Sequence, residues 1–311
     1  AGVQVLIGIV ALVAIAFLGN LHDTNLLDSL SEVVQTDSLE SVDNSNNTST
    51  VTNVDGDLII DYIDVGQADS ILIRQGDATM LIDGGTSECK DDLLAFLSDK
   101  NIDKFEYVVG THTHEDHIGS LDDVVNRYDF DTFLFPNTTA TTKTFENLVL
   151  AVQQKNKKFT VPQVGQEYSL GEAKFQILAP NGDDYSSANN YSIVIKLTYG
   201  SNTFLFTGDA ESISESEILD KGFNVSADVL KVGHHGSTTS TSKEFLDAVS
   251  PKYAVISVGK DNSYNLPTKT TMEKLQEKNI PVYRTDEQGT IECISDGTNI
   301  TFNVEPGSYA Y

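Results

Sequence analysis

The chain has 311 residues, of which 39% are hydrophobic and 21% charged, so it can bury a sizeable core and is not wholly disordered. Acidic residues outnumber basic ones 46 to 20, giving a formal net charge of −26. This charge disfavours generic binding to nucleic acid, which needs many Lys and Arg side chains against phosphates. Two cysteines, Cys89 and Cys293, are too few for a disulfide scaffold or a cysteine-based zinc finger, and the sequence leaves open whether they pair.

An apolar stretch without charge occupies residues 3–18 and has one polar side chain, Gln4. Its length suits a membrane span, which takes ~20 residues, or the core of a signal peptide; a buried core helix is the alternative. We therefore predict a transmembrane or signal-anchor segment over residues 1–21, with the membrane as a partner if this segment is not cleaved. No Lys or Arg occurs before Arg74. Because positive charge marks the cytoplasmic side, the rest of the chain is expected outside the cytoplasm, membrane-anchored or secreted.

A polar segment follows over residues 22–56, rich in Ser, Asp, Asn and Thr and without basic residues. Such a composition cannot bury enough apolar surface to offset its ordering entropy, which predicts a linker. A short amphipathic helix is possible within it at residues 26–34. The folded domain is predicted over residues 57–305, with residues 306–311 as a tail.

The predicted domain alternates short β-rich runs with helical patterns, which indicates sheets covered by helices in an α/β layered fold. Strands are predicted, in chain order, over residues 58–64, 70–74, 79–82, 107–110, 175–178, 193–198, 204–207, 229–232, 254–257, 291–294 and 300–304. Helices are predicted over residues 90–99, 121–128, 145–154, 215–221 and 270–278.

A histidine-rich loop, THTHEDH at residues 111–117, follows the fourth predicted strand and holds three of the six histidines. His112 and His114 can point to the same side and hold one cation, while Asp116 and His117 can turn toward a second. Imidazole and carboxylate together suit zinc, iron or manganese. A solvated polar loop is the alternative, but four ligand-type residues in this spacing favour a metal site.

Two later predicted strands end in residues of the same kind. Gly208 lets the chain turn tightly and exposes Asp209, whose carboxylate could bridge two cations; capping of the next helix is the alternative. Residues 233–237, GHHGS, follow the strand predicted at residues 229–232. They offer one imidazole as a ligand and another within reach of a substrate.

The histidine loop, HTHEDHIGSL, resembles the HxHxDH signature of the metallo-β-lactamase fold. Five further segments resemble, in order, the hydrolase domain at the C-terminus of the ComEC family of DNA-uptake channels: YIDVGQADSILI, MLIDGG, NNYSIVIKLTYGSNTFLFTGDAE, LKVGHHGS and VYRTDEQGTI. The resemblance covers about Asp57–Glu305. It implies an αββα four-layer sandwich with a metal site at one edge of the sheets, and it is more specific for the fold than for the substrate.

The resemblance also implies roles for single residues. His112 and His114 match ligands of a first metal ion, Asp116 and His117 match ligands of a second, and Asp209 matches the bridging carboxylate. One of the adjacent pair His234 and His235 matches a further ligand, and the other is expected near the scissile group. We assign His234 to the metal, and Asp209 and His235 to catalysis. Asp209 would hold the pair of metal ions, and His235 would donate a proton to the leaving oxygen or contact the substrate anion.

Other positions match supporting groups. Asp83 matches an acid that orients the histidine loop. Asn190 and Ser192 match a polar element expected to contact the substrate, and the turn at Ser237 is expected to contact a phosphate. Leu266 departs from the pattern, because relatives often carry a histidine there, and this change could remove a ligand or a substrate contact.

The function expected from these features is metal-dependent hydrolysis, with two divalent ions, zinc favoured and manganese possible, that activate a water for attack. The resemblance favours a phosphodiester bond. The net charge favours a small phosphodiester or a nucleic-acid fragment over long DNA. Two alternatives stay open: hydrolysis of another ester or amide bond, including a β-lactam, and a catalytically degenerate metal-binding module, which Leu266 would support.

Overall fold

The computed structural model describes residues 34–35 and 56–311. The predicted membrane segment, most of the predicted linker and the helix predicted at residues 26–33 lie outside the described residues. Val34, the last residue of that predicted helix, belongs to a short strand. Among the described residues, no helix is long and apolar enough to cross a membrane.

The first of two β-sheets has nine strands in the order β1-β7-β6-β5-β4-β3-β2-β15-β16. They are β1 (Val34–Gln35), β2 (Leu58–Tyr62), β3 (Ile71–Gln75), β4 (Ala78–Ile82), β5 (Lys104–Val109), β6 (Asp129–Leu134), β7 (Phe159–Thr160), β15 (Ile291–Ser295) and β16 (Ile300–Phe302). Strands β4 to β7 run parallel because helices connect them, whereas β2, β3 and β4 are antiparallel, with a loop between β2 and β3 and a tight turn between β3 and β4. The carboxyl ends of β4 and β5 therefore lie at the same edge.

The second sheet has seven strands in the order β14-β13-β12-β11-β10-β9-β8. They are β8 (Glu167–Leu170), β9 (Ala173–Ala179), β10 (Val194–Tyr199), β11 (Asn202–Phe206), β12 (Val229–Lys231), β13 (Tyr253–Ile256) and β14 (Val282–Arg284). Strands β11 to β14 are parallel, so their carboxyl ends also share one edge.

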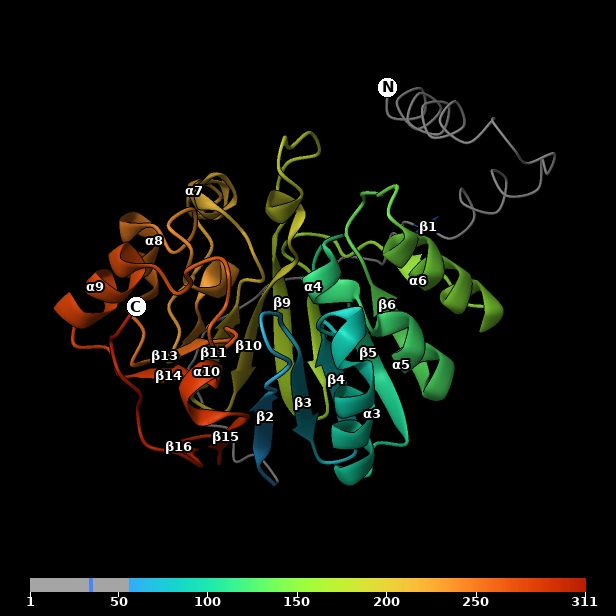
Figure 1. The fold of residues 1–311 in the computed structure, drawn as a ribbon, viewed down its shortest axis with the longest axis horizontal. Coiled ribbons are helices and arrows are strands. Elements are labelled where there is room, and N and C mark those ends of the chain that lie inside the picture. Colours follow the sequence, from blue (N-terminus) through green and yellow to red (C-terminus); the bar gives the residue numbers. More distant parts are fainter. Residues whose placement is uncertain (1–33, 36–55) are drawn as a thin grey trace, which may run out of the picture.

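Helices cover the outer face of each sheet (Figure 1). Those on the first sheet are α3 (Lys90–Asp99), α4 (Glu115–Ile118), α5 (Leu121–Arg127) and α6 (Lys143–Gln154). Those on the second sheet are α7 (Ser212–Asp220), α8 (Lys243–Val249) and α9 (Lys269–Glu277). A short helix, α10 (Thr285–Gln288), follows β14.

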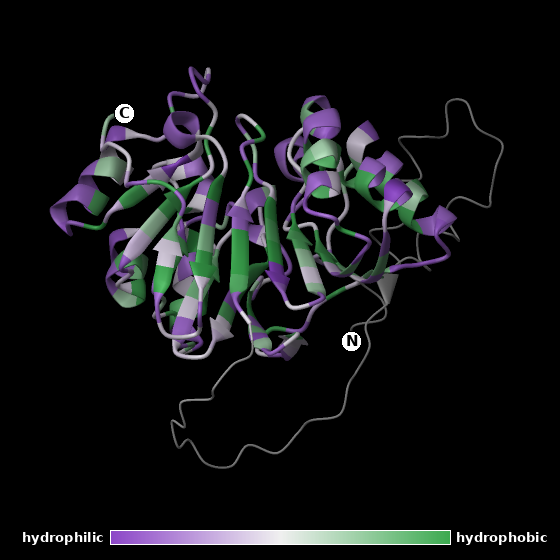
Figure 2. Cartoon of the chain, turned by 90° about the horizontal axis from the view of Figure 1, so that it is seen from below, coloured by the Kyte–Doolittle hydropathy of each residue, from purple (hydrophilic) through white to green (hydrophobic). Residues whose placement is uncertain are grey.

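Three apolar clusters hold these layers together. One lies between the sheets, and the other two pack the helices against the outer face of each sheet. Among the described residues, the strands are accordingly the most apolar segments, and polar residues face outward on the helices (Figure 2). The predicted layered α/β fold with two sheets is thus confirmed. Cys89 and Cys293 are both free, and Cys293 is buried in the cluster between the sheets.

Residues 306–311, predicted as a tail, lie against the outermost strand of the second sheet. The backbone N–H of Gly307 donates to the Val282 carbonyl at 2.7 Å. The hydroxyl of Tyr309 donates to the Ile280 carbonyl at 2.7 Å, and its ring packs on the cluster beneath α7 to α9. This segment therefore contributes to the packing of the domain.

We expect Tyr309→Ala to lower the free energy of unfolding by about 1–2 kcal/mol, because it removes a hydrogen bond and apolar contacts. Tyr264→Ala is the control, since that side chain is 70% exposed, and should change stability by less than about 0.5 kcal/mol. Urea denaturation followed by circular dichroism measures both. Equal effects of the two substitutions would show that residues 306–311 do not stabilise the fold.

Candidate metal centre

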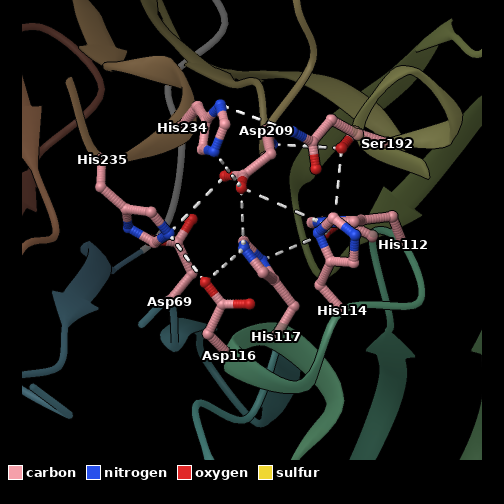
Figure 3. Close-up of polar contacts among 12 residues, drawn as sticks. Asp69, His112, His114, Asp116, His117, Ser192, Asp209, His234 and His235 are labelled. Carbon is pink, nitrogen blue, oxygen red and sulfur yellow. Dashed lines mark hydrogen bonds and ion pairs between the residues drawn. The ribbon is translucent and has the colours of Figure 1, made fainter. Parts of the chain in front are cut away.

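The predicted ligands meet at one edge of the two sheets, where the carboxyl ends of several strands face one another (Figure 3). Strand β5 leads into the histidine loop, and β4 ends one residue before Asp83. On the second sheet, β11 leads to Asp209, and β12 leads to His234 and His235. Each sheet thus supplies part of the site.

The histidine loop is held in place by contacts behind it. Glu115, at the start of α4, accepts hydrogen bonds from the backbone N–H and the hydroxyl of Ser87, at 2.8 and 2.7 Å. Gly119 packs so tightly that a Cβ there would lie 2.3 Å from the Ser87 nitrogen, so no other residue fits. These contacts fix the direction in which Asp116 and His117 point.

The facing turns have unusual backbone conformations. Gly208, just before Asp209, has a φ of +50°. His234 and His235 have φ values of 49° and 52°, in the left-handed region that non-glycine residues seldom adopt. Backbone strain of this kind collects at functional sites, where the fold must hold side chains in required directions.

Three groups of residues could hold a metal ion, and two of them include Asp209. The third is Asp69, Asp83 and His117, in which Asp83 faces the Nδ1 side of His117; the other two are the ligand sets. The three-donor set is His112, His114 and Asp209, in which His112 Nε2 lies 3.1 Å from His114 Nδ1. The four-donor set is Asp116, His117, Asp209 and His235. Within it, the Asp209 carboxylate approaches His117 Nε2 at 3.3 Å and His235 Nε2 at 3.8 Å. Asp209 is thus placed between two candidate cation positions.

The four-donor set passes a test of fit for a metal ion. His117 Nε2, His235 Nε2 and Asp209 Oδ1 are buried and have no hydrogen-bond partner among the described residues. Buried polar atoms nearly always have a partner, so three orphaned atoms in one cluster need an explanation. A divalent cation supplies it, because imidazole and carboxylate are ligands of both zinc and manganese.

The charges of this cluster also call for a cation. Burial alone would raise the pKa of Asp209, but His117 and His235 hold it well below its usual range. Burial would lower the pKa of His117, yet Asp209, Asp83 and Asp116 raise it well above its ordinary value. The imidazoles thus attract protons to balance the carboxylates, and a bound cation would displace those protons.

Both imidazoles of the four-donor set have a carboxylate behind them. Asp83 Oδ2 lies 2.8 Å from His117 Nδ1, and the same carboxylate accepts hydrogen bonds from the N–H and hydroxyl of Thr111, at 2.8 and 2.7 Å. The orienting role of Asp83 stays a prediction, and its carboxylate lies where that role would need it. Asp69 Oδ1 lies 3.3 Å from His235 Nδ1. Asp69 has no predicted role, although it lies in a segment that carries the family resemblance.

Residues 63–260 match the family described as the metallo-beta-lactamase superfamily. The chain belongs to the metallo-beta-lactamase superfamily. This membership, together with the candidate ligand sets, makes it a metal-dependent hydrolase of a fold that generally binds two divalent cations.

Three curated relatives share sequence with this superfamily member. ComE operon protein 3 of Bacillus subtilis is 31% identical over 265 residues, which cover 79% of this chain and 34% of the relative. Competence protein ComA of Neisseria gonorrhoeae is 29% identical and covers 74% of this chain and 31% of its own. Recombination protein 2 of Haemophilus influenzae is 31% identical, with 75% and 28% covered. The chain thus spans about a third of the length of these relatives, and the predicted resemblance to the ComEC competence family is confirmed.

Solved structures of the superfamily share the fold. The metallo-beta-lactamase fold protein YhfI from Bacillus subtilis has a TM-score of 0.51 at 14% identity and covers 76% of this chain and 99% of its own. The metallo hydrolase Igni18 from Ignicoccus hospitalis has a TM-score of 0.50 at 15% identity, with 76% and 98% covered. At such identities the likeness concerns the fold alone.

The adjacent histidines of this superfamily member differ in burial and in their relation to the ligand sets. His235, predicted near the scissile group, is buried and belongs to the four-donor set. His234, predicted as a ligand, belongs to neither set, and its side chain is 26% exposed. Its Nε2 lies 3.6 Å from Asp209 Oδ2, and its Nδ1 lies 2.9 Å from Thr239 Oγ1. The geometry favours His235 as the ligand. His234 is then a partly exposed side chain next to Asp209, and we call this exposed side, formed by His234 and Thr239, the mouth of the site.

The side chains of Asn190 and Ser192, predicted to contact the substrate, are both buried and bond to groups around the site. The Asn190 oxygen accepts hydrogen bonds from the backbone N–H groups of Glu211 and Ser214, at 3.2 and 3.3 Å, and so anchors the start of α7. The Ser192 hydroxyl accepts from the Asp209 N–H at 3.1 Å and lies 3.4 Å from His112 Nδ1. Both residues support the site from behind.

Ser237 and Leu266, which the sequence also singles out, belong to neither ligand set. Ser237 is half-buried next to the mouth, and its hydroxyl lies 3.1 Å from Thr239 Oγ1. Leu266 packs against the apolar cluster beneath α7 to α9. Both ligand sets are assembled without a side chain from this position.

Proposed function

We propose that this chain is a dinuclear metal-dependent phosphodiesterase that acts outside the cytoplasmic membrane on a small phosphodiester or a nucleic-acid fragment. The observation that carries the proposal is the pair of ligand sets that share Asp209. The three orphaned, buried ligand atoms add support, because no hydrogen bond between residues 34–35 and 56–311 uses them.

In the proposed site, His112, His114 and Asp209 hold one cation, and Asp116, His117, Asp209 and His235 hold the other. Two such cations supply a water of lowered pKa, about 7, and positive charge for phosphoryl oxygens. Asp209 would be the ligand common to both cations. His234 is the side chain at the mouth that can donate a hydrogen bond to a substrate oxygen, and Thr239 orients its ring.

The substrate class rests on two supports. Relatives named as a competence protein and a recombination protein favour a phosphodiester of the nucleic-acid type. The formal charge of −26 opposes long polyanions, which favours a short fragment or a nucleotide. Zinc is the favoured metal and manganese the alternative, since both accept this donor set.

The location rests on residues 1–73. The apolar stretch at residues 3–18 supports a membrane anchor, and the lack of Lys and Arg before Arg74 supports an external domain. Protease added to intact cells should therefore cleave the domain of a full-length chain. Protection that is lost only when the cells are lysed would place the domain inside.

The experiment uses the full chain purified in mild detergent. Bound metal is quantified by elemental analysis, and the same sample is assayed on bis(p-nitrophenyl) phosphate and on a chromogenic cephalosporin. We expect about two metal ions per chain, with phosphodiester turnover that a chelator removes and added zinc or manganese restores. Turnover of the cephalosporin alone would show that the chain hydrolyses an amide bond and not a phosphodiester. Bound metal without turnover of either substrate would indicate a binding module.

A further inference from the structure

Lys231, the last residue of β12, is a lysine that is completely buried, at 0% exposure. Its Nζ lies 2.8 Å from Asp69 Oδ2, and Asp69 is 2% exposed. Taking two charges out of water costs several kcal/mol per ion, and apolar residues of similar volume are often at least as stabilising. A pair of this kind is therefore weak evidence for a purely stabilising role.

The pair is directed at one ligand of the four-donor set. His235 Nδ1 lies 2.9 Å from the Ser257 carbonyl, which can only accept, so Nδ1 carries the proton. In the neutral ring, the lone pair is then on Nε2, which faces Asp116 and Asp209 at 3.3 and 3.8 Å. Asp69 Oδ1, which has no hydrogen bond within the described part of the chain, lies 3.3 Å from the same Nδ1.

Asp69 is itself fixed by its backbone. Its N–H donates to the Asp116 carbonyl at 3.1 Å, and its carbonyl accepts from the Gly85 N–H at 2.8 Å. Lys231 holds one carboxylate oxygen, and the other lies 3.3 Å from His235 Nδ1. A carboxylate behind a histidine ligand fixes the ring and raises its basicity, and loss of such a partner typically costs about 10–100-fold in metal affinity or activity.

We propose that Asp69 and Lys231 are positioning residues that hold His235 as a metal ligand and so set the affinity of the four-donor cation position. Asp69 acts on the imidazole directly, and Lys231 acts through Asp69. The inference rests on the metal site of the proposed function but not on its phosphodiester substrate.

The test uses three variants of the full chain: Asp69→Asn, Lys231→Met and the double variant. Metal-free protein is titrated with Co²⁺ in the presence of a chelating indicator, which yields a dissociation constant for each bound ion. We expect each variant to weaken the binding of one of the two ions by about 10–100-fold and to leave the other unchanged. The double variant leaves no unpaired buried charge, so it carries the test if Lys231→Met alone fails to fold.

The double variant also separates positioning from simple charge balance. If Asp69 and Lys231 serve only to neutralise each other's charge, the double variant has wild-type affinity for both ions, and the proposal is overturned. Wild-type affinity in both single variants, or a wild-type chain that binds no ion, overturns it as well. A wild-type chain that binds two ions without phosphodiester turnover contradicts the proposed function and leaves this inference standing.

Lys100→Met is the matched control. Lys100 Nζ pairs with Asp61, another buried carboxylate, at 2.8 Å, but it lies beside β2 and β15, outside the ligand sets. This substitution removes one of two cations that pair with a buried carboxylate, since Arg74 stays 2.9 Å from Asp61, and it should leave both dissociation constants unchanged. An equal loss of Co²⁺ affinity in this control would mean that general destabilisation explains the result.

Discussion

Replacing Asp209 with Ala is expected to abolish turnover and to lower the metal content, because Asp209 is the one side chain that both ligand sets share. Its carboxylate is buried, and it lies 3.3 Å from His117 Nε2 and 3.8 Å from His235 Nε2. Loss of an outer partner of a ligand typically costs about 10–100-fold in metal affinity or activity, so loss of the shared ligand itself should exceed about 100-fold. Elemental analysis and turnover of bis(p-nitrophenyl) phosphate measure the two effects.

Asp131→Ala is the control for this substitution. Asp131 lies on β6, its side chain is 52% exposed, and it pairs with Lys104 at the start of β5, whereas the histidine loop follows the end of that strand. The control therefore removes one carboxylate far from the site and should leave turnover and metal content unchanged. Wild-type turnover in Asp209→Ala would show that the reaction does not use this centre.

The regular elements that the sequence predicts well have strong local patterns. The helix predicted at residues 90–99 coincides with α3, and the strand predicted at residues 229–232 differs from β12 by one residue. The elements that were not predicted are short or depend on neighbours. Strand β6 begins with two exposed acidic residues, Asp129 and Asp131, on either side of the buried Phe130, and β14 has only three residues. Such segments become strands because parallel neighbours pair with them, which local pattern does not reveal.

Some residues of the candidate site can likewise be predicted from local sequence patterns, and others cannot. The histidine loop and Asp209 are found from the sequence, because ligand-type residues there follow directly on strands. The choice between His234 and His235 depends on a turn in which both residues have left-handed backbone, and no local pattern announces it. The contact between Asp69 and Lys231 joins the loop before β3 to the end of β12, in the other sheet. Only the packing of the two sheets brings them together.

Asp83→Asn is expected to weaken the binding of one of the two metal ions by about 10–100-fold with little change in backbone structure. Asp83 has a φ of +59°, and Asn tolerates this conformation as well as Asp does. The carboxylate accepts from Thr111 and faces His117 Nδ1 at 2.8 Å. An amide nitrogen placed there would donate to Nδ1, which moves the ring proton to Nε2 and removes the lone pair that a cation needs. Titration with Co²⁺ and an indicator measures the loss.

Asp228→Asn is the control that separates an effect on the metal site from an effect on stability. Asp228 also accepts hydrogen bonds from the N–H and hydroxyl of one threonine, Thr203, at 2.8 and 3.2 Å, but it precedes β12, at the strand end opposite to the ligands. Both substitutions replace a carboxylate oxygen, which accepts hydrogen bonds, by an amide NH₂ group, which donates them. Both should therefore lower the free energy of unfolding by about 1–3 kcal/mol. Only Asp83→Asn should also change metal affinity, because only Asp83 contacts a ligand. If both variants keep wild-type affinity, Asp83 merely stabilises the turn that begins the histidine loop; if both lose it, the loss follows from stability.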